Sequence, residues 1–414
     1  MNSADKITGR VRRRREPRRD SETSEPADVL SQLISDNSAL GQAISQLSGT
    51  PMLAVDTEFM RERTYHAHLC LLQLASEDVA FVIDPLSGVD LTMLSELFYD
   101  PNIVKVFHAG SQDMQILDEL LGKPVAPVFD TQVAASLLGL PQQMSLAALV
   151  KAYIDIELDK SDTYSDWSKR PLRTAQISYA LDDVRYLPAI YRQMQSELKA
   201  AGRANWLDEE FKALSDPATY RDLPELLWRK IKGNSSLTRR QLGVLQQVTL
   251  WREQVAREKD LPRRWVVADE QLLDVAKRSP TNRDELSMTR GLHEKLTRSM
   301  ATGLLDAVSK GLKMVEKDLP SRGSRPVKVN GFTSAMDLMQ TLVHQRANEN
   351  HIAASILAPN SELQALAAGQ REGVSILNGW RRELIGNELL ELLEGQLTLS
   401  LKNGLLKVTR ASEA

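Results

Sequence analysis

The segment Met52-Leu-Ala-Val-Asp-Thr-Glu58 joins a short apolar run to two acidic residues. The run that ends at Val55 has the length and composition of a buried strand. Because side chains two residues apart on a strand share one face, Asp56 and Glu58 aim their carboxylates at one point. An α/β sheet opens its active crevice at the carboxyl ends of its strands, so the segment predicts a site for a hard cation such as Mg²⁺. The alternative is a solvated turn, since acidic pairs end many strands.

Around this segment, strand-like and helix-like runs alternate over residues 28–205. Further apolar runs of strand length lie at Leu69–Leu74, Val79–Ile83 and Val104–Phe107. Helical patterns lie at Leu91–Tyr99, Ser111–Leu121 and Thr131–Leu138. Several strands come first and helices then alternate with them, which predicts an α/β domain with a mixed sheet covered by helices.

The strand signal fades after residue 205. Residues 239–259 place Val244, Val248, Trp251 and Val255 on one helical stripe, and Pro262 closes that helix. Further helical patterns lie at Asp269–Lys277, Arg283–Leu286, Leu292–Lys310 and about Thr333–Glu394. The sequence therefore predicts two small all-α domains, over residues 206–318 and 331–414, with a linker over residues 319–330.

The composition limits the class of protein. The chain has 414 residues, of which 42% are hydrophobic and 26% charged, so several domains with real cores are expected. Its single cysteine, Cys70, excludes an intramolecular disulfide and a multi-cysteine zinc site, and it favours a reducing compartment. The longest uncharged run contains glutamines and a proline, and no apolar region follows the basic N-terminus. We therefore expect a cytoplasmic monomer without membrane contact.

Charge is distributed unevenly along the chain. The formal charges of residues 1–20, 50–205 and 221–318 sum to +5, −8 and +6. An acidic block between basic ones suggests a metal-using site beside surfaces that hold a polyanion. Residues 1–27 lack apolar periodicity and are predicted to form a disordered basic tail, either a solubilising leader or an arm that contacts RNA.

Three further side chains extend the acidic pair. Asp113 follows the strand at Val104–Phe107 and opens a helix, where it alternatively complements the helix dipole. Tyr179 and Asp183 stand at i and i+4 on one helical face, although Tyr179 alone is as readily a core aromatic. Four carboxylates neutralise two divalent cations, which clamp the attacking and leaving oxygens of a phosphoryl displacement. With a phenol to orient the water, the set predicts phosphodiester hydrolysis.

Three strings carry a resemblance to a known superfamily: Leu53-Ala-Val-Asp-Thr-Glu-Phe59, Val106-Phe-His-Ala-Gly-Ser-Gln-Asp113 and Tyr179-Ala-Leu-Asp-Asp183. They resemble the three motifs of the DEDD exonucleases, and Tyr179 matches the tyrosine-bearing subgroup. A closer resemblance, to the ribonuclease D family, spans roughly residues 28–200. It rests on residues 56–65, Ile83-Asp-Pro-Leu86, Leu158-Asp-Lys-Ser161, Asp166-Trp167 and Arg170-Pro-Leu172.

The resemblance implies a ribonuclease H-like sheet and an exonuclease that trims from the 3′ end with two Mg²⁺ or Mn²⁺ ions, releasing nucleoside 5′-monophosphates. By position, Asp56 would bridge both metals, and Glu58 and Asp183 would hold the metal that binds the attacking water. Asp113 would hold the second metal and Tyr179 would orient the nucleophile. The sequence departs from the family at Leu181-Asp182, where small residues are ordinary. The extra acid, Asp182, is either exposed or alters metal preference.

Further residues of the first domain are candidates for substrate binding: Thr57, Phe59, His108, Trp167 and Arg170. Phe59 either stacks on the terminal base or packs in the core. His108 is an attractive acid or base, but a two-metal scheme needs none, which favours a structural hydrogen bond. Trp167 and Arg170 precede the third motif and are candidates for contact with the substrate. The alternative for Trp167 is that it only anchors its loop. Cys70 is expected in the core.

The helical part resembles the helicase-and-ribonuclease-D C-terminal (HRDC) family, most clearly over residues 220–310. Such modules hold RNA in that family. Four arginines near helix ends are candidates for phosphate contact, with a merely solvated face as the alternative: Arg239, Arg240, Arg263 and Arg264. Residues 330–410 look like the less regular second module, for which packing or docking is at least as good an interpretation as RNA contact.

The resemblance thus implies a 3′→5′ exoribonuclease that acts on structured RNA precursors, with transfer RNA 3′ ends as the expected substrate. One alternative is a DNA exonuclease of the same superfamily, because the catalytic residues do not sense the sugar. An alternative of another class is a non-catalytic RNA-binding scaffold.

Overall fold

The computed structural model describes residues 30–159, 162, 165–289, 291–292, 298–321 and 332–411. The predicted tail over residues 1–27 lies outside the described residues. So do Lys160, Ser161, the start of the helix predicted from Leu292, and most of the predicted linker.

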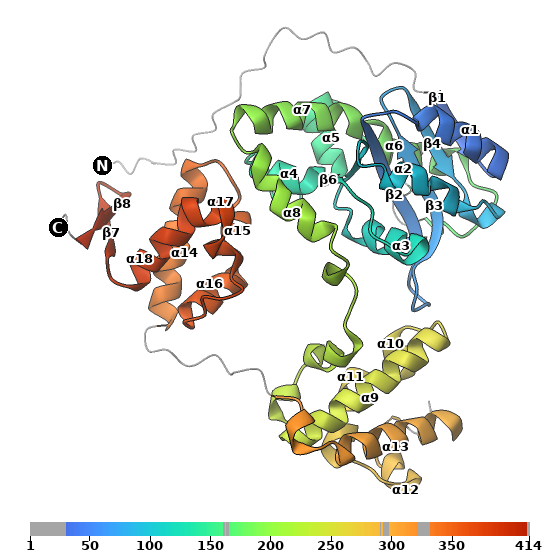
Figure 1. Ribbon diagram of the computed structural model, residues 1–414, viewed down its shortest axis with the longest axis vertical. Helices are drawn as coiled ribbons and strands as arrows, with labels where there is room; N and C mark the ends of the chain where they lie inside the picture. Colours follow the sequence, from blue (N-terminus) through green and yellow to red (C-terminus); the bar gives the residue numbers. More distant parts are fainter. Residues whose placement is uncertain are drawn as a thin grey trace, which may run out of the picture.

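A six-stranded mixed sheet forms the centre of the N-terminal part (Figure 1). Its strands are β1 (Leu30–Ile34), β2 (Met52–Met60), β3 (His68–Ala75), β4 (Val79–Ile83), β5 (Val104–Phe107) and β6 (Val128–Asp130). Their order is β1-β4-β3-β2-β5-β6, with β2 and β4 antiparallel to β3 and the other neighbours parallel. The predicted mixed sheet covered by helices is therefore confirmed, and β1 and β6 are strands that the sequence did not predict.

Helices cover both faces of this sheet. They are α1 (Asn37–Leu47), α2 (Ser95–Tyr99), α3 (Ser111–Leu121), α4 (Thr131–Leu137), α5 (Leu146–Ile154), α6 (Thr174–Arg185), α7 (Leu187–Ala200) and α8 (Leu207–Leu214). Because side chains alternate along β2, Ala54 faces a core that includes Ala180 and Val184 of α6, while Leu53 and Val55 face the core of α1 and α3. Asp56 and Glu58 continue the face toward α6.

The first helical part contains α9 (Arg239–Glu258), α10 (Arg263–Val266), α11 (Asp269–Arg278), α12 (Arg283–Ser287) and α13 (Arg298–Lys313). The turn between β2 and β3 reaches this part through Tyr65 (Figure 1). The Tyr65 hydroxyl donates to Glu253, and the backbone N–H groups of Tyr65 and His66 donate to Asp260 Oδ1 at 3.0 Å each. The strand that carries the acids is thus tied to α9.

The second helical part contains α14 (Phe332–Glu349), α15 (Ala354–Leu357), α16 (Asn360–Ala367), α17 (Gly379–Arg381) and α18 (Asn387–Leu393), with a π-helical turn at Arg382–Gly386. A two-stranded sheet that the sequence did not predict follows, of β7 (Leu397–Lys402) and β8 (Leu405–Arg410). Short 3₁₀ turns lie at Pro85–Ser87, Leu91–Leu94, Ala204–Trp206, Pro217–Thr219, Pro224–Lys230, Asn234–Ser236, Glu316–Asp318 and Ser375–Leu377.

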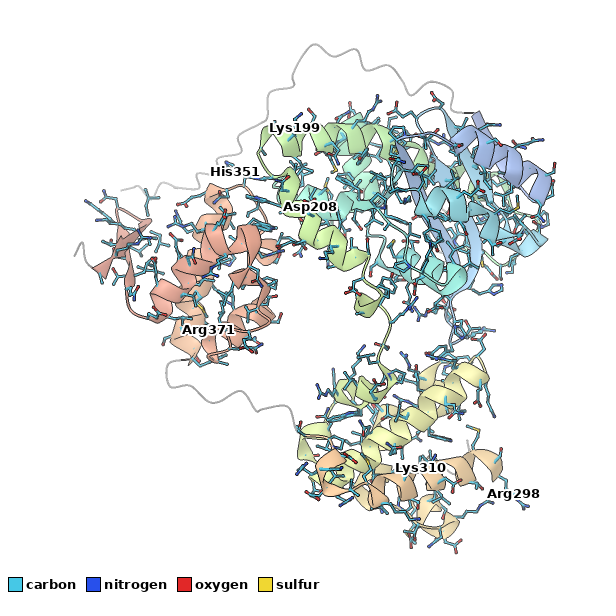
Figure 2. The ribbon with its side chains drawn as sticks, in the orientation of Figure 1. Lys199, Asp208, Arg298, Lys310, His351 and Arg371 are labelled. Atoms are coloured by element: carbon cyan, nitrogen blue, oxygen red, sulfur yellow. The ribbon has the colours of Figure 1, made fainter. Side chains whose placement is uncertain are left out.

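The second helical part packs against the sheet domain. The indole of Trp206 stacks on that of Trp380, with ring centroids 4.6 Å apart, and Arg381 pairs with Glu210 of α8 at 2.5 Å. Figure 2 shows His351 on the side of this part that faces Asp208 of α8. These contacts agree with the packing or docking interpretation of this module, and its alternative, contact with RNA, stays a prediction. Among the described residues, none of the helices has the length and apolar character needed to cross a bilayer.

One arginine fastens the segment before α6 to the sheet. Nε and Nη2 of Arg170 donate to the two carboxylate oxygens of Asp84 at 2.6 Å each. Nη2 also donates to the carbonyl of Cys70 at 2.9 Å, and Nη1 to that of Trp167 at 2.7 Å. The guanidinium thereby holds the Trp167 loop against β3 with 27% of its side chain still exposed, and its contact with the substrate stays a prediction.

We predict that Arg170→Met lowers the free energy of unfolding by about 2–3 kcal/mol, because it leaves the buried Asp84 carboxylate without its bidentate partner. Denaturant unfolding followed by tryptophan fluorescence measures the loss. Lys169→Met is the matched control, since that side chain is largely exposed and pairs only with the neighbouring Asp166 within the described residues. Equal stability of the two variants would contradict the assignment.

Candidate active site

The strand predicted to end at Val55 continues to Met60 as β2, and three acidic side chains meet where this strand passes beneath α6. Asp56 and Glu58 come from β2 and Asp183 from α6, and one carboxylate oxygen of each lies within 4.8 Å of the other two. The two elements pack together, which brings Asp183 to Asp56 and Glu58, 127 and 125 positions away in the sequence. A cluster of hard carboxylate oxygens suits divalent cations such as Mg²⁺ or Mn²⁺.

Asp113 borders this cluster without belonging to the three-acid group. It lies buried in the first turn of α3, and its Oδ1 accepts a hydrogen bond from the Thr57 hydroxyl. Burial raises the pKa of Asp113 to about 6. Thr57 is itself buried and its hydroxyl supports the Asp113 carboxylate, while its contact with the substrate stays a prediction.

The clustered carboxyl groups favour their protonated forms when no cation is bound. Burial raises the pKa of Glu58 to about 8, with a further contribution from the charges of Asp183 and Asp113. Burial, with the charge of Asp182, raises the pKa of Asp183 to about 7, and the pKa of Asp56 is also raised well above its usual range. Divalent cations compete with these protons, so the arrangement fits metal ions chemically.

Tyr179 and its neighbours complete the α6 side of the cluster. Tyr179 is half-buried one turn before Asp183, and its ring centroid lies 5.9 Å from that of Trp167. Trp167 is only 3% exposed, which matches the alternative that it anchors its loop. Asp182 pairs with Arg185 at 3.1 Å and is 20% exposed, so it is directed to a neighbour on its own helix and not to the three-acid group.

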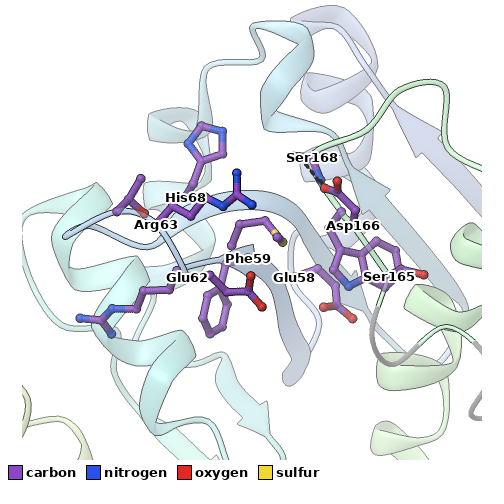
Figure 3. Close-up of a pocket in the computed structure, with 12 residues that line it drawn as sticks. Glu58, Phe59, Glu62, Arg63, His68, Ser165, Asp166 and Ser168 are labelled. Atoms are coloured by element: carbon purple, nitrogen blue, oxygen red, sulfur yellow. Dashed lines mark hydrogen bonds between the residues drawn. The ribbon is translucent and has the colours of Figure 1, made fainter. Parts of the chain in front are cut away.

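A cavity of about 660 Å³ opens beside Glu58. It is lined by residues 58–64 and His68 on one side and by residues 165–168 on the other. Figure 3 shows Phe59, Arg63 and His68 across the cavity from Ser165, Asp166 and Ser168. Phe59 therefore lies where a base could stack. Arg61, Arg63 and His68 are lining residues that sequence reasoning missed, although two arginines directly after an acidic motif are a visible signal.

His108 lies in a closed hydrogen-bond arrangement. Its Nδ1 lies 2.9 Å from Thr131 Oγ1 and its Nε2 lies 2.9 Å from the carbonyl oxygen of Met144. Burial lowers the pKa of the ring, which favours the neutral form. The structure therefore supports the structural role, because both ring nitrogens already have partners within the protein.

The four arginines of the first helical part differ in their surroundings. Arg239 binds Glu316 at 3.1 Å, and Arg240 donates to the carbonyls of Leu312 and Met314. Arg263 donates to Glu253 at 2.6 Å and to Asp222 at 3.1 Å, beside Tyr65. Arg264 pairs with Glu270 at 3.3 Å while 67% of its side chain is exposed. The contact with RNA stays a prediction for all four, and Arg264 is the most accessible of them.

Comparisons with known proteins agree with this arrangement. The profile of a family described as 3′-5′ exonuclease matches residues 31–199, and that of the HRDC domain matches residues 241–308. The chain is 40% identical over 382 residues to ribonuclease D of Sphingobium indicum, covering 91% of this chain and 98% of that protein. It is 36% identical over 385 residues to ribonuclease D of Zymomonas mobilis, covering 91% and 97%. Among solved structures the chain is similar to Escherichia coli RNase D, which is described as an exoribonuclease involved in structured RNA processing. The TM-score is 0.79 and the sequence identity is 32%, and the match covers 88% of this chain and 99% of that one.

The raised carboxyl pKa values predict how metal-free stability depends on pH. A group whose pKa rises from 4.5 to about 8 on folding, as for Glu58, destabilises the fold once it ionises. The free energy of unfolding of the metal-free protein should therefore fall as pH rises through this interval, and Mg²⁺ should raise the melting temperature more at pH 8 than at pH 6. Thermal unfolding with EDTA or Mg²⁺ measures both effects.

Glu58→Gln should flatten this pH dependence and reduce the response to Mg²⁺. Asp78→Asn removes an exposed acid of the same domain and should change neither. An unaltered pH profile in Glu58→Gln would show that the cluster does not carry the effect.

Proposed function

The chain belongs to the ribonuclease D family of 3′→5′ exoribonucleases, and on this premise we propose that Asp56, Glu58, Asp113 and Asp183 hold the two divalent cations at which RNA is hydrolysed. The observation that carries the proposal is the convergence of Asp56, Glu58 and Asp183 on one point, with Asp113 at its border. Their burial and mutual repulsion support the assignment, since such a cluster is stabilised when cations replace its protons.

The reaction replaces one bond at phosphorus by another. The oxygen of a water bonds to phosphorus while the bond from phosphorus to the 3′-oxygen of the preceding nucleotide breaks, and that oxygen leaves with a proton. Two bound cations supply charge stabilisation for both oxygens. The product is a nucleoside 5′-monophosphate and an RNA shortened by one residue.

The protein's own side chains position the reactants. The Tyr179 phenol, which lies beside Trp167 and one helical turn before Asp183, orients the water by a hydrogen bond and keeps its own proton near neutral pH. Phe59 stacks on the terminal base in the cavity beside Glu58, and the positive charges of Arg61 and Arg63 face the strand's phosphates. Stacking and phosphate contacts tolerate any base, which suits an enzyme that removes one nucleotide after another.

We propose a division of labour among residues 28–205, 206–318 and 331–414: catalysis, RNA binding and docking. The substrates are the 3′ ends of structured RNA precursors, transfer RNA among them, and the cations are Mg²⁺ or Mn²⁺. The single thiol, Cys70, is buried and free, which suits a monomer working in the reducing cytoplasm.

Asp56→Asn should lower the rate of metal-dependent hydrolysis by about 10³-fold or more, equivalent to about 4 kcal/mol of transition-state free energy, and leave RNA binding largely intact. The assay uses 5′-labelled and 3′-labelled RNA with Mg²⁺, Mn²⁺ or EDTA, and a DNA strand of matched sequence. Trimming from the 3′ end should shorten the 5′-labelled strand stepwise and release 3′ label at once as a mononucleotide.

Asp182→Asn makes the same chemical change one residue from Asp183 and should keep most of the activity, because Asp182 is paired with Arg185. Full turnover by Asp56→Asn would refute the catalytic assignment. Faster digestion of the DNA strand would instead identify a DNA exonuclease, and binding without hydrolysis by the unmodified protein would identify a scaffold.

Of the four arginines, we propose Arg264 as the principal phosphate contact, since its side chain is the most exposed. Arg264→Ala should weaken RNA binding and reduce the slope of log K against log salt concentration by about 0.7, the value for one phosphate of a single strand. Arg240→Ala is the matched control, because that guanidinium donates to the carbonyls of Leu312 and Met314 and should not alter the slope. Fluorescence anisotropy over a salt series measures both, and identical slopes for the two variants would contradict the assignment.

A further inference from the structure

A buried glutamine on β3 has no hydrogen-bond partner. Gln73 is 0% exposed, and neither its Nε2 nor its Oε1 has a partner among the described residues. Leu71 and Ala75, which share its face of the strand, are apolar core residues. Burying an amide without hydrogen bonds destabilises a protein, so an orphaned amide in a core calls for an explanation.

Gln73 stands directly across the sheet from the first acid of the site. In the antiparallel pairing of β2 with β3, the Cα partner of Asp56 is Gln73. Side chains of directly opposed residues point to the same face, with Cβ atoms about 4.5–5.5 Å apart. The amide therefore lies beside Asp56, on the face where Glu58 also projects.

The helix that carries the third acid closes over this position. α6 packs on β2, β3 and β4, and its residues Ala180 and Val184 belong to the same core as Leu71 and Ala75. Asp183 directly precedes Val184 on the same helix. Gln73 is thus enclosed by the sheet below and α6 above, next to the cluster of Asp56, Glu58 and Asp183.

Other buried polar side chains of the sheet domain have partners. Lys105 donates to the carbonyls of Asp100 and Ile103, and Thr131 Oγ1 lies within hydrogen-bond distance of His108 Nδ1 and of the carbonyl of Phe107. Asp130 accepts from the backbone of Gly110 and of the first turn of α4. Among the described residues of 30–205, Gln73 alone has buried side-chain polar atoms without a partner. A purely structural role would require hydrogen bonds that this amide does not make.

We propose that Gln73 is a positioning residue of the metal centre, whose amide hydrogen-bonds the Asp56 carboxylate and orients it when divalent cations are bound. This inference rests on the proposed metal site. A carboxylate ligand that accepts a hydrogen bond from a neighbouring side chain is held in one orientation, and loss of such a partner typically weakens metal binding about 10–100-fold. In the metal-free protein the same amide is a destabilising element.

These two statements give Gln73→Leu an unusual signature. The melting temperature of the metal-free variant should rise, by about 2–4 °C, because an unsatisfied amide is replaced by an apolar group of similar size. Its affinity for Mn²⁺ alone, measured by calorimetry without RNA, should fall by about 10-fold or more. A structural role predicts the reverse pattern, with a lower melting temperature and unchanged affinity.

Two further variants serve as a repeat and as a control for this test. Gln73→Met repeats the change with a flexible side chain, and Leu74→Met alters the same strand on its opposite face and should affect neither affinity nor the metal response. Unchanged Mn²⁺ affinity in Gln73→Leu would overturn the inference, as would failure of both Gln73 variants to fold. If the unmodified protein itself binds no Mn²⁺, the proposed metal site fails and not the assignment of Gln73 alone.

Discussion

Asp56, Glu58 and Asp183 repel one another when they are ionised, yet the fold holds their oxygens within 4.8 Å in a largely buried place. Such an arrangement is unfavourable by itself, and the surrounding structure has to impose it. The apolar faces of β2 and α6 do so, because Ala54, Ala180 and Val184 lock the helix onto the sheet directly beside the acids. The burial that raises the carboxyl pKa values is therefore the same packing that fixes their geometry.

This constraint extends beyond the sheet because β2 does not end at the cluster. The chain runs from Glu58 along the wall of the cavity to Tyr65, which binds Glu253 of α9. The orientation of the cavity wall thus depends on the same segment that joins the catalytic part to the first helical part. On the other side, Arg170 ties the Trp167 loop to Asp84, and Trp167 contacts the ring of Tyr179. Both walls of the cavity are held by polar contacts between segments distant in sequence.

Local patterns in the sequence were enough to predict the centre of the fold. The runs at Val79–Ile83 and Val104–Phe107 are the strands β4 and β5, and the helix predicted at Ser111–Leu121 is α3. β6 was not predicted because three residues are too few to show a period. β7 and β8 were not predicted because most of their side chains are solvent-exposed, so the two strands lack a clear apolar pattern. The convergence of the acids could be predicted from spacing and topology. The partners of Arg170 and Arg240 within the protein could not. Their partners, Asp84 and the carbonyls at the C-terminal end of α13, lie 86 and more than 70 residues away, and no local signal identifies them.

The contrast between arginines also limits what charge sums can say about RNA binding. Residues 221–318 have an excess of positive charge, but Arg240 donates to backbone carbonyls and Arg263 to the buried Glu253, whereas Arg239 forms a surface pair with Glu316. An arginine that closes a helix end or pairs with a buried glutamate contributes little to the field that a phosphate meets. The charge sum of residues 221–318 therefore overstates the positive charge that a polyanion would meet at the surface, and Arg264 is the most exposed of the four arginines. The arginines are polar groups whose partners lie within the protein, whereas the buried Gln73 amide has no such partner among the described residues. This lack of a partner is the reason why we assign Gln73 to the metal centre.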